Sequence, residues 1–228
     1  MSVVKYSKKQ HGEMFCSKHT QVREMACKDG SDVVLIDGDL MEMIEKLFSK
    51  LNCKKYLISS GYRTPTHDKT VGGNGKGQHT LGKAVDACFY DKRGEIIPAQ
   101  IVCCVAQDIG FPGIANISKK YQYVHLDVRE SGKYYGDEIK GLNTVTKDFY
   151  KYFGVLKSDV AKYTKGYFPK YNGTTVSIVN ALNSLGEKSS FAYRSTIAKA
   201  NDIPLYVGTS KQNKKMLSLL KQGKLIRP

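Results

Sequence analysis

The sequence predicts an α+β domain followed by a small all-α domain. Strand-like and helix-like stretches alternate in the first half, whereas the C-terminal part carries helical patterns alone. A Lys- and Tyr-rich stretch without firm periodicity separates the two. Because such a change of pattern is typical of a domain boundary, we expect a first domain at 1–141, a linker at 142–166 and a second domain at 167–228.

The elements of the first domain are predicted from the spacing of apolar residues. Residues 37–50 should form a helix, because Leu40, Ile44 and Leu47 fall on one helical stripe. A second, buried helix is expected at 98–109. The glycine-rich stretch 64–78 predicts a loop, and strands are predicted at 55–60, 85–90 and 121–129.

The second domain contains three helical stretches, each preceded by a possible N-cap. They are expected at 175–185, 190–201 and 209–222. The candidate caps are Thr174, Ser189 or Ser190, and Thr209, and Gly186 and Gly223 are candidate stops.

The formal net charge of +15 is concentrated toward the C-terminus. Residues 146–228 carry 15 Lys and Arg against 4 Asp and Glu, whereas the rest of the chain carries 21 against 17. An excess of this kind indicates an anionic partner, such as nucleic acid, anionic lipid or a bacterial wall polymer. A role in solubility alone is the alternative.

The chain contains no apolar run of about 18 residues, so we expect no membrane insertion. Its first residues lack an apolar signal core, so Sec export is not expected either. Six cysteines occur, and reduced thiols are the expectation for a protein that folds in a cytoplasm.

Two histidines and an aspartate are the most informative residues of the chain. His79 and Asp86 are seven residues apart, and His125 follows on a predicted strand. A catalytic zinc ion takes three protein ligands and keeps its fourth position open. His79, Asp86 and His125 match that number and that choice of ligands, so the sequence predicts a site for Zn²⁺.

The predicted strand at 121–129 gives this site a polar surface. Side chains alternate between the two faces of a strand, so His125, Asp127 and Arg129 should share one face. The residues between them are apolar and should face the core. A turn at Gly82 would let the chain fold back, so that His79 and Asp86 converge.

These residues resemble the M15 metallopeptidases, a family of D-Ala-D-Ala carboxypeptidases and phage peptidoglycan endopeptidases whose fold is shared with the hedgehog signalling domain. The family block Ser-x-His-x-x-Gly-x-Ala-x-Asp corresponds to the segment Gly77-Gln-His-Thr-Leu-Gly-Lys-Ala-Val-Asp86, with Gly77 in place of the usual Ser. The segments Gly61-Tyr-Arg, Val71-Gly-Gly and Tyr123-Val-His-Leu-Asp-Val-Arg129 also match. The resemblance spans residues 12–136 and implies a hedgehog-like antiparallel sheet with helices and one zinc ion.

The resemblance leaves the general base open. Many family members carry an acid three residues before the last ligand, and Gln122 stands there, which cannot act as a base. Asp127 has the right strand parity and is the candidate base. The alternative is that Asp127 orients a histidine or pairs with Arg129. Arg63 matches the family's Tyr-Arg and is a candidate for binding a substrate carboxylate or an oxyanion, with a structural ion pair as the alternative.

The C-terminal part resembles the cell-wall-binding domain of clostridial and bacillary phage endolysins. The matching residues are Tyr167-Phe-Pro-Lys-Tyr-Asn-Gly173, Ser177-Ile-Val-Asn-Ala-Leu182, Ser190-Phe-Ala-Tyr-Arg194, Ile197-Ala-Lys-Ala-Asn201, Tyr206-Val-Gly-Thr209, Gln212-Asn213 and Gly223-Lys-Leu-Ile226. This resemblance implies a module that binds bacterial peptidoglycan or anionic wall polymers.

Together the two resemblances imply an endolysin: a zinc peptidase that cuts the peptide stems of peptidoglycan and waits in the cytoplasm of the infected bacterium until its release to the wall. A host D-Ala-D-Ala carboxypeptidase or remodelling hydrolase is one alternative. A catalytically silent wall-binding protein is another, which Gln122 keeps open. Nucleic acid is not expected as a partner, because the sequence shows no groove of stacking aromatic residues.

Overall fold

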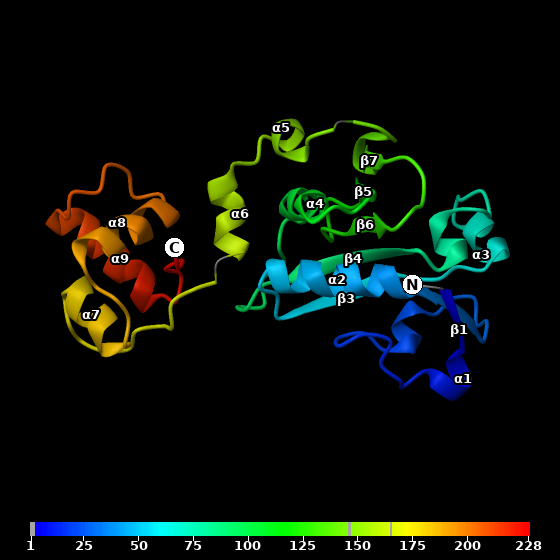
Figure 1. Ribbon diagram of the computed structural model, residues 1–228, viewed down its shortest axis with the longest axis horizontal. Coiled ribbons are helices and arrows are strands. Elements are labelled where there is room, and N and C mark those ends of the chain that lie inside the picture. Colours follow the sequence, from blue (N-terminus) through cyan, green and yellow to red (C-terminus); the bar gives the residue numbers. More distant parts are fainter. Residues whose placement is uncertain (1–2, 146, 165) are drawn as a thin grey trace. The chain divides into compact units, whose positions relative to one another are not determined.

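The computed structural model describes residues 3–145, 147–164 and 166–228 and divides the chain into two compact units (Figure 1). Unit 1 is Met1–Leu156 and unit 2 is Lys157–Pro228. No helix in the described ranges is long and apolar enough to cross a membrane.

Unit 1 contains two sheets. The larger has five strands in the order β3-β4-β6-β5-β7, and the smaller is an antiparallel pair of β1 and β2. Neighbouring strands of the larger sheet are antiparallel except for the last pair. The connection after β6 carries the chain past β5, so β7 runs parallel to β5 and the expected antiparallel sheet is a mixed one. The bounds are β1 (Val3–Ser7), β2 (Val33–Asp37), β3 (Lys55–Ser60), β4 (Ala84–Tyr90), β5 (Gly113–Asn116), β6 (Val124–Asp127) and β7 (Tyr134–Asp137).

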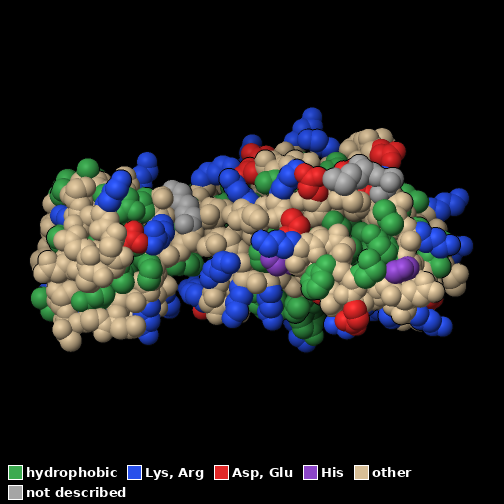
Figure 2. Space-filling view, turned by 60° about the horizontal axis from the view of Figure 1, so that its bottom comes forward, with side chains coloured by type: hydrophobic (Ala, Val, Ile, Leu, Met, Phe, Trp, Pro, Cys, Tyr) green, Lys and Arg blue, Asp and Glu red, His purple; other side chains and the backbone are tan. Residues whose placement is uncertain are grey.

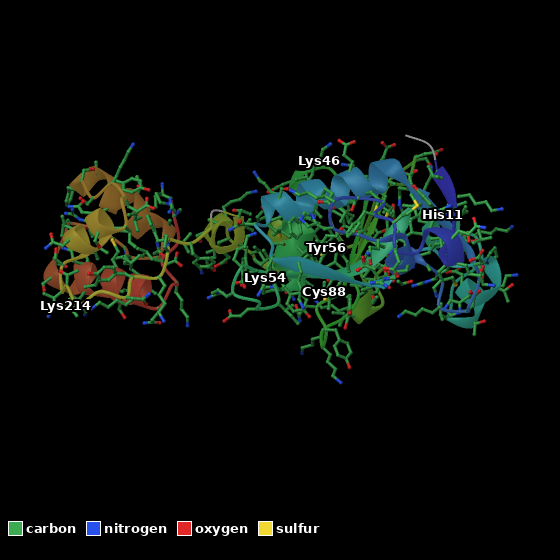
Figure 3. All side chains as sticks on the ribbon, turned by 90° about the horizontal axis from the view of Figure 1, so that it is seen from below. His11, Lys46, Lys54, Tyr56, Cys88 and Lys214 are labelled. Carbon is green, nitrogen blue, oxygen red and sulfur yellow. The ribbon has the colours of Figure 1, made fainter. Side chains whose placement is uncertain are left out.

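Two helices, α2 (Gly38–Lys50) and α4 (Ala99–Asp108), cover one face of this sheet (Figure 1). Phe48 of α2 packs edge-on against Tyr56, which in turn contacts Phe89 of β4. Figure 3 shows Tyr56 between α2 and the sheet. Because side chains alternate along β4, the face opposite Phe89 carries Asp86.

Several elements of unit 1 lie where no regular structure was expected. The predicted loop 64–78 contains α3 (Pro65–Thr70), which Thr64 caps by accepting a hydrogen bond from the amide of His67. Thr-Pro at a helix start is a recognisable signal, and the glycines that follow obscured it. The residues before α2 contribute β1, β2, α1 (Lys8–His11) and the 3₁₀ turn η1 (Val22–Met25), none of which was predicted.

The segment 142–166, predicted as a linker, contains two short helices. Its first part folds onto unit 1 through α5 (Phe149–Phe153), where Phe149 is fully buried and its ring lies 5.2 Å from that of Tyr135. Its second part, α6 (Lys157–Thr164), belongs to unit 2. Positions 146 and 165 of the segment lie outside the described residues.

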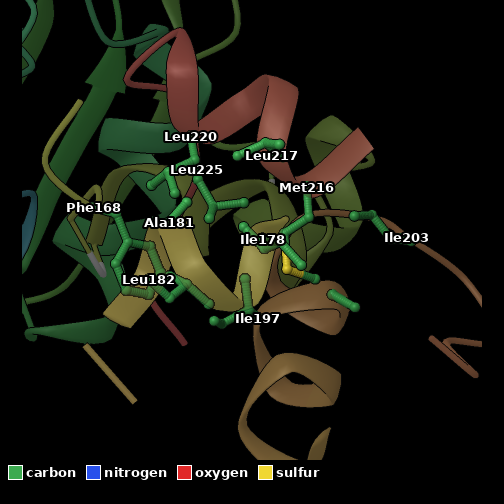
Figure 4. Packing of buried hydrophobic residues seen from close by; sticks show 11 residues of the cluster. Phe168, Ile178, Ala181, Leu182, Ile197, Ile203, Met216, Leu217, Leu220 and Leu225 are labelled. Atoms are coloured by element: carbon green, nitrogen blue, oxygen red, sulfur yellow. The ribbon is translucent and has the colours of Figure 1, made fainter. Parts of the chain in front are cut away.

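Unit 2 packs its helices around a core of its own. The helices are α6, α7 (Ile178–Ser184), α8 (Phe191–Ala200) and α9 (Ser210–Lys221). Buried apolar side chains of α7, α8 and α9 meet in the cluster of Figure 4, together with Phe168, which precedes α7; the cluster includes Ile178, Leu182, Met216 and Leu220. Ser177 caps α7 in place of the expected Thr174, whereas Ser190 and Thr209 cap α8 and α9 as predicted.

Candidate metal centre

The three predicted ligands lie together on the polar side of the sheet. The distances between their facing atoms are 3.2 Å from His79 Nε2 to His125 Nδ1, 3.3 Å from His79 Nε2 to Asp86 Oδ1, and 3.0 Å from His125 Nδ1 to Asp86 Oδ1. Two of the three residues are buried: His79 is 6% exposed and Asp86 is 7% exposed. The atoms form a nearly equilateral triangle.

Strand register brings Asp86 and His125 together. The two residues are direct partners across the antiparallel pair β4–β6, where opposite side chains lie close enough to touch. On its other side, His125 faces Ala115 of β5, whose small side chain leaves room for the imidazole.

His79 reaches the same point from a 3₁₀ turn, η2 (Gln78–Leu81), that precedes β4. Gly82 ends the turn with φ of +72°, and a Cβ built on it would lie 2.5 Å from the carbonyl oxygen of Leu35. Only glycine satisfies both the left-handed backbone and this close approach. The predicted turn at Gly82 thus reverses the chain so that the His79 side chain points toward Asp86.

Hydrogen bonds orient both imidazoles. His79 Nδ1 lies 2.7 Å from the carbonyl oxygen of Gly61, and His125 Nε2 lies 3.0 Å from Asp127 Oδ2. A proton on each of these nitrogens leaves the lone pair of the other nitrogen pointing into the triangle. Metal-binding histidines are generally held this way by a carbonyl or carboxylate on the second nitrogen.

The dimensions of the triangle fit a zinc ion. Tetrahedral zinc with ligands at about 2.0–2.1 Å places its ligand atoms about 3.3 Å apart, close to the 3.0–3.3 Å observed. Two neutral imidazoles and one carboxylate also match the ligands that zinc takes in catalytic sites. No other group of three or more such residues in the described ranges comes this close together.

The electrostatics of the site keep Asp86 ionised. Burial alone would raise the pKa of its carboxyl, but hydrogen bonds with His125 and His79 hold that pKa well below its usual range. Burial opposes a charge on His125, yet its hydrogen bonds to Asp127 and Asp86 prevail and raise its pKa to about 9 in the metal-free protein. The pocket therefore stabilises positive charge between its carboxylates, which is what a cation requires.

Residues 14–127, half of the chain, match the model of the peptidase M15 family. The chain belongs to the peptidase M15 family. The matched residues include the whole triangle, and M15 membership makes the protein a zinc-dependent peptidase. Unit 2 lies outside the match, and no curated protein matches the chain.

Arg63, which follows Tyr62, binds the carboxylate oxygen of Asp86 that does not face the two imidazoles. Its Nη2 donates to Asp86 Oδ2 at 2.9 Å, its Nη1 contacts Asp68 Oδ1 at 3.3 Å, and its Nε donates to Ser60 Oγ at 2.8 Å. The ion pair expected as the alternative to substrate binding is therefore present. Arg63 leaves Asp86 Oδ1 free to face the two imidazoles.

Asp68 was missed by the sequence reasoning, although it explains the glycine at position 73. Asp68 is 3% exposed, and its carboxylate accepts hydrogen bonds from Arg63 and from the amide of Gly75. A Cβ on Gly73 would lie 2.2 Å from Asp68 Oδ2. Glycine at 73 makes room for the carboxylate that holds Arg63.

Asp127 lies beyond His125, on the side away from the triangle. It is fully buried, contacts Nε2 of His125, and accepts hydrogen bonds from Arg129 Nε at 2.9 Å and Arg129 Nη2 at 2.5 Å. Hydrogen bonds from Arg129 and His125 overcome its burial and keep its pKa well below the usual range. This placement favours the alternative role, that of a carboxylate orienting a histidine, over that of a general base.

Gln122 faces a helix and not the triangle. Its Oε1 accepts from the amide of Ala99 at 2.8 Å and so caps α4, and its backbone has φ of +55°. Because this left-handed conformation interrupts the predicted strand 121–129 near its start, the strand β6 begins only at Val124.

Proposed function

We propose that this protein is an endolysin-type zinc peptidase that hydrolyses peptide-stem bonds of bacterial peptidoglycan. The observation that carries the proposal is the His79–Asp86–His125 triangle in a chain of the M15 family. A zinc ion held there would activate water for attack on a peptide carbonyl.

Each polar residue around the triangle has a definite part in this proposal. His79, Asp86 and His125 supply the three ligand atoms. Asp127 holds the proton on Nε2 of His125 so that Nδ1 faces the metal, and it acts through that histidine as a positioning residue. Arg63 fixes the Asp86 carboxylate in one orientation.

Unit 2 is proposed to hold the enzyme on the cell wall. Its acidic residues are paired internally: Asp159 and Asp202 with Lys162, and Glu187 with Arg227. Many of its lysines have no acidic partner among the described residues, and lysine and arginine side chains dominate the charged surface in view in Figure 2. Lys214 on α9 points outward in Figure 3. This excess of positive charge favours an anionic polymer such as a teichoic acid.

The loop 204–209 of unit 2 offers a second reason for proposing a binding role. It exposes Leu205 by 92% and Val207 by 69%, yet Gln212 holds it with four hydrogen bonds to its backbone. Beside it the ring of Phe191 is half exposed and stacks on Tyr206. Apolar side chains displayed on a rigid loop are a common form of ligand contact.

The decisive experiment is mass spectrometry of the fragments released from purified peptidoglycan by the zinc-loaded protein. New amino and carboxyl termini within the stem peptides are expected, and the His79→Ala variant should release none. Intact wall after prolonged incubation, with zinc bound, would refute the peptidase assignment on this substrate and leave the silent wall-binding protein as the better description.

A further inference from the structure

The face of the sheet that carries the triangle continues beyond it as a surface of aromatic and apolar side chains. On β4, Cys88 and Tyr90 follow Asp86 on this face, because side chains alternate along a strand. On β3, Leu57 and Lys55 lie directly opposite Cys88 and Tyr90. The helices α2 and α4 cover the other face (Figure 1), whereas Leu57 is 40% exposed on this one.

Two more tyrosines extend this surface from the segment that precedes β6. The ring of Tyr123 lies 6.3 Å from that of Tyr121, which is 54% exposed. The hydroxyl groups of Tyr123 and Tyr90 both lie near the Cys88 thiol: burial, followed by this thiol, raises the pKa of each. Tyr90, Tyr121, Tyr123 and Leu57 therefore form one continuous patch, here called the tyrosine surface.

Lysine ammonium groups lie over two of the rings. Lys55 Nζ is 4.8 Å from the centre of the Tyr90 ring, and Lys120 Nζ is 4.8 Å from the centre of the Tyr121 ring. Such cation–π contacts are weak at exposed sites. The flexible lysine side chains can therefore give way to a ligand that packs on the rings.

The tyrosine surface has the chemistry of a sugar-binding site. One face of a pyranose ring presents C–H groups that pack on an aromatic ring, and its hydroxyl and acetamido groups bind polar atoms nearby. Tyrosine offers a rigid apolar ring and a polar hydroxyl in one side chain, and Lys55 and Lys120 add hydrogen-bond donors. An anionic polymer would use the lysines alone and would gain nothing from the exposed rings.

The tyrosine surface lies within reach of a sugar whose peptide stem occupies the triangle. A strand rises about 3.3 Å per residue, so Cys88 and Tyr90 lie about 7 Å and about 13 Å along β4 from Asp86. An extended peptide spans about 3.3–3.6 Å per residue, so this distance corresponds to roughly two to four residues of the stem. Because each stem of peptidoglycan is attached to an amino sugar, that sugar can contact the tyrosines while the stem lies at the triangle.

We propose that the tyrosine surface binds the amino-sugar chain of peptidoglycan and so positions the attached stem at the triangle. The inference rests on the proposed peptidase function and names its substrate class: stems still joined to the glycan, in preference to free stem peptides. The tyrosines and Leu57 bind the substrate and take no part in the chemical step.

The test compares one stem peptide in two forms, free and attached to its disaccharide. Binding to the full-length, zinc-free protein is measured by isothermal titration calorimetry, and kcat/KM is measured with the zinc-loaded protein. The disaccharide should tighten binding and raise kcat/KM about tenfold, mainly through a lower KM, as expected for one well-packed tyrosine contact. Since packing on a ring does not depend on charge, this advantage should persist in 1 M salt.

Three variants assign the advantage to the tyrosine surface. Tyr121→Ala should abolish it and leave the free peptide unaffected, whereas Tyr121→Phe, which keeps the ring, should retain it. Tyr121 is over half exposed, so neither substitution disturbs the core. Phe15→Ala is the matched control and should change nothing: Phe15 is 64% exposed, and its neighbour Cys16 contacts Met41 of α2, which covers the other face of the sheet.

The outcomes separate this inference from the proposed function. Equal binding and equal kcat/KM for the two forms, with cleavage intact, would refute the sugar site alone. An advantage that survives Tyr121→Ala, or one that is lost in 1 M salt, would also overturn it, because the sugar would then bind elsewhere or the lysines would be binding an anionic group. Absence of any cleavage, combined with a calorimetric preference for the disaccharide form that Tyr121→Ala removes, would refute the peptidase function and leave the sugar site in place.

Discussion

Replacing Gly113 by alanine should weaken zinc binding without touching a ligand. Gly113 lies directly across from Asp127 in the β5–β6 pair. A Cβ at this position would lie 2.1 Å from each of the three atoms of the Asp127 carboxyl group. That carboxylate is fully buried and is held by His125 and Arg129, so it has little freedom to move aside.

The size of the effect can be estimated from this geometry. Ordinary contact begins at 3.4 Å, so the carboxylate must retreat by about 1.3 Å, which breaks its 3.0 Å hydrogen bond to His125 Nε2. Loss of such an outer partner typically lowers metal affinity by about 10–100-fold, equivalent to roughly 1.4–2.7 kcal/mol. Overpacking should also cost about 1–3 kcal/mol of the free energy of unfolding of the zinc-free protein.

Competition with a zinc chelator measures the affinity, and circular dichroism of the zinc-free protein reports whether the fold survives. Gly77→Ala is the matched control, since Gly77 also has an extended backbone without a positive φ, but a Cβ there meets nothing within 4 Å. A Gly113→Ala protein that folds and binds zinc within twofold of the wild type would show that Asp127 does not set the affinity.

Further predictions concern the ligands, the predicted base Asp127 together with position 122, and unit 2. His79→Ala and His125→Ala should each lose the bound zinc by elemental analysis; full retention in both would place the metal elsewhere. Asp127→Asn should weaken zinc binding about tenfold or more by chelator competition, whereas Gln122→Glu should leave kcat unchanged because that side chain caps α4; a rise in kcat would show that position 122 reaches the metal. A fluorescent fusion of residues 157–228 should label Gram-positive walls, about tenfold more weakly in 1 M than in 0.1 M salt, and no labelling at low salt would contradict wall targeting.

The parts of the fold with strong local patterns were predictable from sequence. β3 matches its predicted range 55–60, and α2 and α4 end within one residue of the predicted helices. β5 and β7 were missed because they are four residues long and contain glycine. Their extended conformation depends on pairing with strands distant in sequence, which periodicity does not reveal.

The candidate site shows the same division. Ligand types and spacing pointed to His79, Asp86 and His125, because zinc restricts which residues can bind it. The supporting residues Asp68, Gly73 and Gly113 have no such signature. Gly113 matters only because β5 lies beside β6, and Gly73 only because α3 turns Asp68 toward it. These are consequences of tertiary contacts, and a single sequence does not display them.

The contacts of His79 with the start of its own loop have a consequence for how the protein responds to metal. His79 Nδ1 bonds the carbonyl oxygen of Gly61, and the His79 carbonyl accepts from the amide of Arg63 at 3.1 Å. His79, which lies near the end of the segment 61–82, is therefore hydrogen-bonded to residues at its start, and α3 lies between them. Zinc bound to His79 would lower the population of molecules in which this segment is locally unfolded. Removal of the metal should therefore increase local unfolding of residues 61–82 and speed tryptic cleavage after Lys69 and Lys76. The helices on the opposite face of the sheet should keep their protection from hydrogen exchange.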